Sequence, residues 1–219
     1  MKLVIGDILD RYELAALREA AAALPFQDGK KTAGRFAREI KDNQQATASP
    51  ELQAILDKVE KSLRANSAFM SAARPQQFVG LMLSRYHDGM AYGTHVDDAL
   101  MAGGRTDLSF TLFLSEEDSY EGGELVIEDY IEDQAIKLQA GDMVLYPSNT
   151  LHRVAPVTKG ERLVIIGWVT SWVRDPAQRE VLYDLDLSIA EAWAEAGKSP
   201  QLDRLTKTRS NLLRMWAGG

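Results

Sequence analysis

The 219-residue sequence contains no cysteine, only three histidines and fewer basic than acidic residues. Without cysteine, neither a disulfide scaffold nor a thiolate metal site can form, so any transition-metal site depends on histidine and carboxylate ligands. The 25 lysines and arginines are outnumbered by 32 acidic residues, which gives a net charge of −7. Nucleic-acid binding needs clustered positive charge, so we expect no nucleic-acid partner.

The sequence also lacks a long apolar run. No stretch of about 18 apolar residues is present, so we expect no membrane span. The apolar run at the N-terminus is short and ends at Asp7 and Asp10, unlike a signal peptide. The chain is 45% hydrophobic and 26% charged, which is typical of a globular protein with a sizeable core. A cytoplasmic location is therefore expected.

The hydrophobic pattern divides the chain into three parts: residues 1–75 as an N-terminal helical region, 76–174 as a β-rich core and 175–219 as a C-terminal helical extension. Asp10, Ser49 and Asp175 stand where helix caps are expected, and a proline follows each of the last two. Apolar residues recur at helical spacing after each cap. Both outer parts are therefore predicted to be mainly helical.

The middle part alternates short β-branched and aromatic runs with glycine-containing turns. Strands are predicted at Phe78–Tyr86, Leu108–Leu114, Glu124–Ile127, Ala135–Leu138, Met143–Tyr146, His152–Val154 and Arg162–Trp172. Seven or more short strands at this spacing favour an all-β sandwich, jelly roll or barrel. The fold class expected for the whole chain is α+β.

A candidate metal site begins with His95 and Asp97, which form an H-x-D motif. Residues two apart on an extended segment point to the same side, so the two side chains can reach one ion. His152 could complete a set of two histidines and one carboxylate, the facial triad of non-haem Fe(II) oxygenases. The motif is short enough to arise by chance, and His152 could equally lie in a turn or on the surface.

Arg162 opens a run, Arg-Leu-Val-Ile-Ile-Gly-Trp, that is typical of a buried strand. A buried guanidinium is costly unless an anion pairs with it, and its fork matches a carboxylate. Arg162 is therefore a candidate for binding a dicarboxylate. The alternative is an arginine at a strand end that reaches solvent or an acidic neighbour.

The motifs together resemble the PKHD-type hydroxylases, bacterial Fe(II)- and 2-oxoglutarate-dependent dioxygenases related to prolyl 4-hydroxylases. The resemblance covers nearly the whole chain. It lies in the stretch Arg85–Asp98, in Arg105–Ser109, Thr111–Ser115, Gly122–Leu125, Leu145–Pro147, His152–Val154, Pro156–Thr158 and Val173–Asp175.

The resemblance implies a double-stranded β-helix (jelly-roll) core with His95, Asp97 and His152 as iron ligands. It implies that Arg162 binds the far carboxylate of 2-oxoglutarate and that Tyr86 lines the cosubstrate pocket, although Tyr86 could also be a core aromatic. The implied reaction hydroxylates a substrate with release of succinate and CO2, with O2 as co-reactant and ascorbate as reductant. Some relatives have a second pocket tyrosine where this chain has Phe113, so Arg162 needs a different supporting partner.

The remaining candidates are less specific. His87 is expected at the pocket rim, outside the ligand set, while Met90 and Tyr92 could line the substrate entrance or pack beneath the loop. The substrate could be a peptide or a small molecule, and the C-terminal helices could form a homodimer. A cupin-like metal enzyme that does not use 2-oxoglutarate, or a non-catalytic sensor of iron and 2-oxoglutarate, remain as alternatives.

Overall fold

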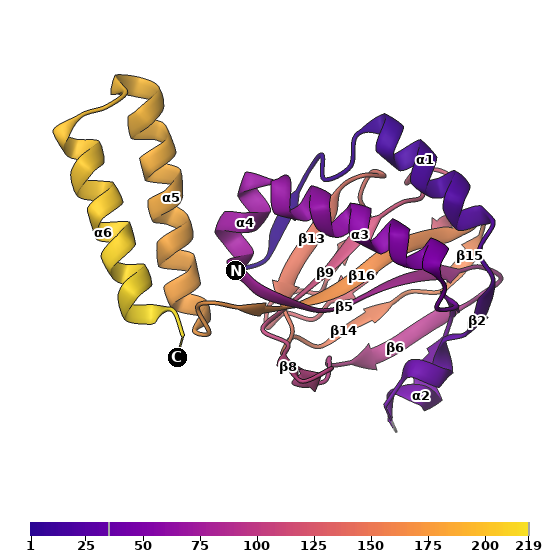
Figure 1. Cartoon of the computed structure of the whole chain (residues 1–219). Coiled ribbons are helices and arrows are strands. Elements are labelled where there is room, and N and C mark those ends of the chain that lie inside the picture. The colour runs from indigo at the N-terminus through magenta and orange to yellow at the C-terminus, as the bar shows by residue number, and fades with distance from the viewer. Residues whose placement is uncertain (35, 219) are drawn as a thin grey trace.

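Two antiparallel β-sheets form the body of the computed structural model, which describes residues 1–34 and 36–218 (Figure 1). The larger sheet has the order β1-β13-β9-β16-β5-β4-β2, and the smaller one has the order β12-β11-β14-β6-β3. The strands of the larger sheet are β1 Leu3–Ile5, β13 Met143–Pro147, β9 Leu108–Phe113, β16 Arg162–Ser171, β5 Pro75–Tyr86, β4 Gln44–Ala46 and β2 Phe26–Asp28. Those of the smaller sheet are β12 Gln134–Ile136, β11 Leu125–Ile127, β14 His152–Val154, β6 Ala91–His95 and β3 Lys41–Asp42.

Two short ribbons close the ends of this sandwich. One pairs β7 Leu100–Met101 with β8 Gly104–Arg105, and the other pairs β10 Glu121–Gly122 with β15 Val157–Lys159. The N-terminal segment also contains a 3-10 helix, η1 Gly29–Thr32, and a short helix, α2 Ala37–Ile40, beside β6.

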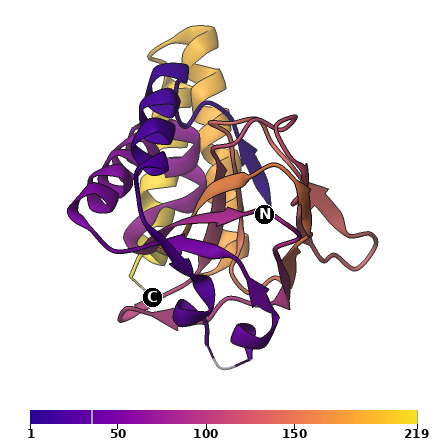
Figure 2. The same ribbon diagram turned by 90° about the vertical axis from the view of Figure 1, so that its right-hand side faces the viewer.

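Helices α1 Arg11–Ala22, α3 Pro50–Ala65 and α4 Ser67–Ala73 cover the outer face of the larger sheet (Figures 1 and 2). Asp10 caps α1 through a capping box, and Ser49 caps α3 with Pro50 in the first turn, as the sequence predicts. The apolar stripes of these helices bury Leu17, Leu56 and Leu63 in the main core cluster. The helices therefore exclude water from one face of the sheet.

Alternate side chains of β9 point to opposite faces of the larger sheet. Leu108, Phe110 and Leu112 belong to the core cluster under the helices, whereas Ser109 and Thr111 line a cavity between the sheets. Side chains on a strand alternate between faces with a period of two residues. In β16 the same alternation places Ile165 and Val169 in the helix-side core, and Arg162, Ile166 and Trp168 at the cavity.

All seven strands predicted from the sequence are present, with shifts of up to three residues at their ends. The N-terminal region differs from the mainly helical expectation, because it also supplies β1, β4 and β2 to the larger sheet and β3 to the smaller one. These strands have only two or three residues, too few to show a periodic pattern. They form because longer partners, β13, β5 and β6, offer free edges.

The chain ends in a hairpin of two long helices, α5 Pro176–Ala196 and α6 Pro200–Trp216, which stands beside the sandwich (Figure 1). Asp175 caps α5 and Ser199 caps α6, each followed by proline in the first turn. Contacts between α4 and α5 connect the hairpin to the body. None of the helices in the described part of the chain combines the length and the apolar character that a membrane span requires.

Candidate active site

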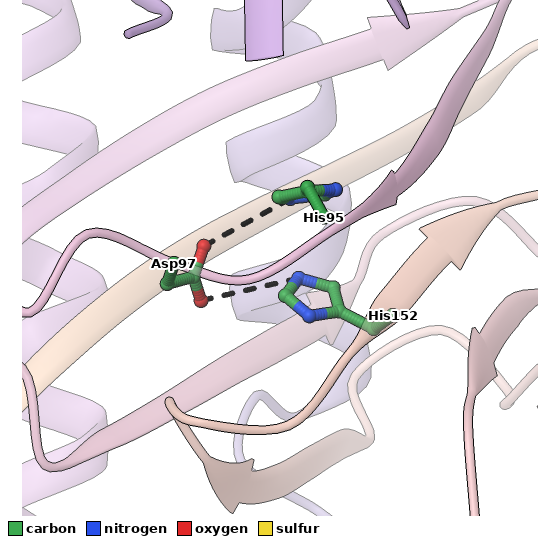
Figure 3. Close-up of side chains that lie close together, drawn as sticks. All are labelled: His95, Asp97 and His152. Atoms are coloured by element: carbon green, nitrogen blue, oxygen red, sulfur yellow. Dashed lines mark ion pairs between the residues drawn. The ribbon is translucent and has the colours of Figure 1, made fainter. Parts of the chain in front are cut away.

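His95, Asp97 and His152 converge between the two sheets (Figure 3). His95 ends β6 and His152 begins β14, and these neighbouring strands pair the two residues directly. The Nε2 atoms of His95 and His152 each lie 3.9 Å from a different oxygen of Asp97. Ligands about 2.0–2.2 Å from one ion are separated by roughly 3–4 Å, so this spacing suits a single metal ion.

Backbone carbonyls orient both imidazoles. The Nδ1 of His95 lies 2.9 Å from the Gly93 carbonyl oxygen, and the Nδ1 of His152 lies 2.9 Å from that of Thr150. Because a carbonyl can only accept, each Nδ1 carries the proton and donates it. Each Nε2 therefore presents a lone pair to the site, the tautomer that a metal requires.

The surroundings keep His95 neutral. Burial, reinforced by the charge that His152 would carry, lowers the pKa of His95 to about 4. The ring of Tyr92 stacks on the His95 ring with centroids 3.7 Å apart, and this contact restricts rotation of the imidazole. A neutral, fixed imidazole is ready to bind a metal at neutral pH.

A buried serine pair holds Asp97. Ser109 Oγ on β9 donates a 2.6 Å hydrogen bond to Asp97 Oδ2, and Ser148 Oγ lies 2.8 Å from Ser109 Oγ. Both serines are almost fully buried. Neither serine was predicted from the sequence, because a serine within a strand and a serine after Pro147 carry no distinctive pattern.

Arg162 is completely enclosed at the start of β16, with 1% of its surface exposed. Its guanidinium carbon lies 5.2 Å from the centroid of the Tyr86 ring and 5.3 Å from that of Phe113. Burial lowers the pKa of Arg162, while Tyr86 and Tyr120 oppose this shift. The side chain thus lies among aromatic rings without a carboxylate partner among the described residues, and the alternative of an arginine reaching solvent is wrong.

Tyr120 is the partner that the sequence did not predict. Its side chain is buried beside Arg162, and burial raises its pKa while Arg162 lowers it. Gly123 makes this approach possible: a Cβ at that position would lie 2.9 Å from Arg162 Cδ and 3.1 Å from a Tyr120 ring carbon. The Gly122-Gly123 motif could have pointed to Tyr120, because such close packing near an expected pocket is one reason for paired glycines.

One cavity of about 330 Å³ joins the His-Asp-His cluster to Arg162. Ligand pockets of this kind commonly measure 300–1,000 Å³. Tyr86 and Tyr92 line the cavity, as the sequence analysis proposed, whereas Met90 packs against the cluster around Tyr86 and Tyr120. His87 lies outside the ligand set and contacts Asp88.

The N-terminal segment supplies an unexpected part of the wall. Thr32, Ala33, Gly34, Ala37 and Lys41 line the same cavity as residues of β16 and of the loop after β6. The sequence predicted only a mainly helical part here, because nothing in the composition of this segment indicates proximity to a pocket. Its position follows from the pairing of β3 with β6.

The residues of the cavity fit a metal ion and a dicarboxylate. The two imidazole nitrogens and one carboxylate form a donor set suited to divalent iron. Arg162, on the cavity wall, is buried beside Tyr120, and no carboxylate of the described residues pairs with its charge. A buried charge without a counter-ion is costly, so a carboxylate bound at the guanidinium would supply the missing interaction.

Comparison with known families agrees with this geometry. Residues 81–170 match the 2OG-Fe(II) oxygenase superfamily, and residues 176–218 match the PKHD-type hydroxylase C-terminal domain. A PKHD-type hydroxylase of Maricaulis maris is 51% identical over 217 residues, which cover 99% of both chains. One of Picosynechococcus is 48% identical over 214 residues, 97% of this chain and 98% of the relative.

Solved structures share the fold at low identity. A prolyl-4-hydroxylase of Pseudomonas putida aligns with a TM-score of 0.53 and 21% identity, over 78% of this chain and 92% of the other. The viral collagen prolyl hydroxylase of Paramecium bursaria Chlorella virus-1 gives 0.54 and 19%, over 78% and 96%. The jelly-roll architecture expected from the sequence is confirmed. The chain belongs to the PKHD-type hydroxylase family, and it is a 2-oxoglutarate-dependent dioxygenase of the 2OG-Fe(II) oxygenase superfamily.

Proposed function

We propose that this enzyme hydroxylates a C–H bond of an organic substrate and releases succinate and CO2, with ascorbate as a reductant. His95, Asp97 and His152 would hold Fe(II), and Arg162 would bind the far carboxylate of 2-oxoglutarate. When bound, iron and 2-oxoglutarate together supply the O2-activating chemistry. The observation that carries this proposal is the shared cavity, with a three-ligand cluster at one place and, at another, a buried guanidinium that has no carboxylate partner among the described residues.

The side chains prepare the site before any ligand arrives. The carbonyls of Gly93 and Thr150 fix the imidazole tautomers, and Ser109 fixes the Asp97 carboxylate. Two sheets hold the parts at fixed separation, since His95 and His152 belong to the smaller sheet and Arg162 to the larger. Such pre-organisation lowers the entropy cost of orienting a cosubstrate.

Arg162 is suited to select a dicarboxylate. Its guanidinium is charged, planar and enclosed by Tyr86 and Phe113, so a carboxylate can bind it bidentately in a dry environment. Tyr120, buried beside Arg162, carries a hydroxyl that can donate a further hydrogen bond. A cupin-like enzyme that does not use 2-oxoglutarate would have no need of this buried cation.

The test is spectroscopic and catalytic. Anaerobic addition of Fe(II) and 2-oxoglutarate should give a visible metal-to-ligand charge-transfer band, and admission of O2 should give succinate. In Arg162→Leu, the dissociation constant for 2-oxoglutarate should rise by about 100-fold, because a buried charge-assisted contact is lost. Fe(II) affinity should change much less.

Arg153→Leu is the matched control, because Arg153 follows His152 directly but forms an exposed ion pair with Asp133. It should leave both affinities unchanged. If Fe(II) binds but neither the charge-transfer band nor succinate appears, the result contradicts the proposed dioxygenase reaction. The band without succinate on admission of O2 would instead favour the non-catalytic sensor. Equal loss of both affinities in Arg162→Leu would point to a structural role for the arginine.

We further propose that residues 1–75, 76–174 and 175–219 are three parts of the chain with different roles. The last part would form a dimer surface. Leu187 and Trp193 of α5 are exposed, and they face a groove between α4, α5 and α6. Exposed apolar side chains gathered at a groove favour association. Sedimentation equilibrium should give twice the chain mass, and Trp193→Ser should shift it toward the monomer.

A further inference from the structure

Lys41 is a buried cation on the cavity wall, separate from the cluster and from Arg162. It lies on β3, the edge strand of the smaller sheet, directly opposite Tyr92 of β6. Only 5% of its surface is exposed, although lysine is rarely buried without a counter-ion. Its position brings an ammonium group into the cavity from the side of the N-terminal segment.

The ammonium of Lys41 has little to bind within the described part of the protein. Its Nζ donates one hydrogen bond of 3.2 Å, to Thr32 Oγ1, and it lies 5.2 Å from the centroid of the Tyr92 ring. No carboxylate among the described residues lies within ion-pair distance. An ammonium carries three donors, so Lys41 retains capacity for an acceptor that enters the cavity.

A buried ammonium group needs a compensating interaction. Burial lowers the pKa of Lys41 from 10.5 to about 8, and Asp97 and Asp28 limit the shift without contacting the side chain. Lys41 therefore stays charged at neutral pH, although its burial disfavours the charged form. Functional sites often maintain such unfavourable charges, because the ligand supplies the missing interaction.

The charges of the loaded cavity indicate what Lys41 would bind. The two charges of Fe(II) and that of Arg162 match those of Asp97 and of the two carboxylates of 2-oxoglutarate. Among the described residues that line the cavity, Lys41 is then the cation without a matching anion. Asp98 also lies on this wall, but it is exposed, and solvent screens its charge.

We propose that Lys41 binds a carboxylate of the substrate and thereby orients the substrate toward the metal. This inference rests on the function proposed above and adds a substrate class: carboxylic acids carried by a small molecule or by an exposed chain end. A monoanion is favoured over a phosphate dianion, because one ammonium offsets one charge and Asp98 lies nearby. Thr32, Gly34 and Asp98 border the same part of the cavity, where a Cβ on Gly34 would lie 3.6 Å from Asp98 Oδ2.

The experiment uses acetate and its neutral isostere acetamide as probes of the protein loaded with Mn(II) and saturating 2-oxoglutarate. Paramagnetic relaxation of the methyl protons reports binding near the metal, with the Zn(II) form as the diamagnetic blank. Acetate should bind about tenfold more tightly than acetamide, the effect of one charge-assisted hydrogen bond. This difference should vanish in Lys41→Met and persist in Lys41→Arg.

Lys30→Met is the matched control, since Lys30 belongs to the same segment but is exposed. It removes the same charge from the protein and should retain the preference for acetate. Equal binding of acetate and acetamide in the wild type would overturn the proposal without reference to any variant. Equal acetate binding in the wild type and Lys41→Met would also overturn it.

The charge-transfer band separates this proposal from the function on which it rests. Wild type, Lys41→Met and Lys30→Met should all give the band anaerobically with Fe(II) and 2-oxoglutarate, because Lys41 contacts neither the ligand cluster nor Arg162. If the wild type gives no band, the proposed function fails. If the band is present and the acetate preference is absent, only the role of Lys41 fails.

Discussion

At the scale of single residues, the hydrogen bond from Ser109 to Asp97 should determine how well the metal is held. Without it, the carboxylate can rotate away from the orientation shared with the two imidazoles. Groups that orient metal ligands typically contribute 10–100-fold to affinity. We expect Ser109→Ala to weaken Fe(II) binding by about tenfold or more, measured by competition with a metal-binding dye.

Ser84→Ala is a suitable control for this measurement. Ser84 is a fully buried strand serine of the same larger sheet, but its hydroxyl has no hydrogen-bond partner among the described residues. Its replacement should leave metal affinity unchanged. The positioning role of Ser109 would be refuted if both variants bound Fe(II) as the wild type does.

Lys41 should lower the stability of the metal-free protein at neutral pH. Its pKa is about 8 in the folded chain and 10.5 when exposed, and each pKa unit corresponds to 1.36 kcal/mol. We therefore expect apo Lys41→Met to be more stable than the wild type at pH 7, by up to about 3 kcal/mol. Urea denaturation followed by circular dichroism would measure the difference.

The pH dependence of this difference has a definite sign. Between pH 8 and 10.5 the folded wild type loses the Lys41 proton while the unfolded chain keeps it, so wild-type stability rises with pH. Asp97 and Asp28 are the carboxylates that act on Lys41, and Asp98 lies on the same cavity wall. The advantage of Lys41→Met should therefore shrink above pH 8, and a constant advantage would contradict the assigned burial cost.

Residues of the site differed in how far the sequence could predict them. His95, Asp97 and His152 were brought together as expected because rare residue types occurred at suitable spacing in a recognisable family pattern. Lys41 and Tyr120 are common residue types outside those motifs, and only tertiary packing places Lys41 at the cavity and Tyr120 beside Arg162. Long-range pairing, such as β3 with β6, leaves no local signal in the chain.

At the scale of elements, Asp186 of α5 connects the C-terminal hairpin to the body. It accepts hydrogen bonds from Ser71 on α4, from Arg74 at 2.7 Å and from Arg209 on α6. Arg74 itself is 7% exposed, so loss of its partner leaves a buried charge unpaired. We expect Asp186→Asn to destabilise the hairpin by about 2 kcal/mol, less than for a fully buried pair.

Hydrogen exchange would show whether the loss of stability is confined to the C-terminal hairpin. Amide protection should fall in α5 and α6 of Asp186→Asn and persist in α3, while the charge-transfer band remains. Asp184→Asn, at an exposed position of the same helix, should change neither. Loss of protection throughout the sandwich would instead show that the hairpin and the body unfold together.

The pH dependence of this anchor follows from the pKa of Asp186. Burial alone would raise that pKa, but hydrogen bonds from Ser71 and Arg209 and the charge of Arg74 lower it below 3.8. A depressed carboxyl pKa stabilises the fold above the unfolded value and loses this effect as pH falls through the folded value. The difference in stability between wild type and Asp186→Asn should be at its full size at pH 7 and should disappear below about pH 4.

Element prediction succeeded where a pattern was long enough to repeat. The strands β5, β9 and β16 and the helices α3 and α5 are long, capped or flanked by glycine, and they appeared where expected. The strands β1 to β4 did not, because each has two or three residues and depends on the edge of another strand. Tertiary pairing, rather than local propensity, decides such segments.

At the scale of the whole molecule, the two sheets meet at one cavity, and each contributes a different half of the site. The smaller sheet provides His95 and His152, and the larger sheet provides Arg162 and the serine that holds Asp97. A dicarboxylate held at both places would therefore bridge the sheets. The family resemblance implied the three ligands and Arg162, whereas their division between the sheets and the N-terminal wall of the cavity came only from the fold.

This division of the site predicts that metal and cosubstrate stabilise the protein cooperatively. Mn(II) at 100 times its dissociation constant should add about 2.7 kcal/mol, a rise in Tm of roughly 5–10 °C for a chain of this size. Because only the metal completes the second attachment point, 2-oxoglutarate should raise Tm strongly with Mn(II) present and only slightly after chelation. Arg162→Leu should keep the increment from Mn(II) and lose that from 2-oxoglutarate. The same 2-oxoglutarate increment with and without metal would mean that the cosubstrate does not bridge the two sheets through this cavity.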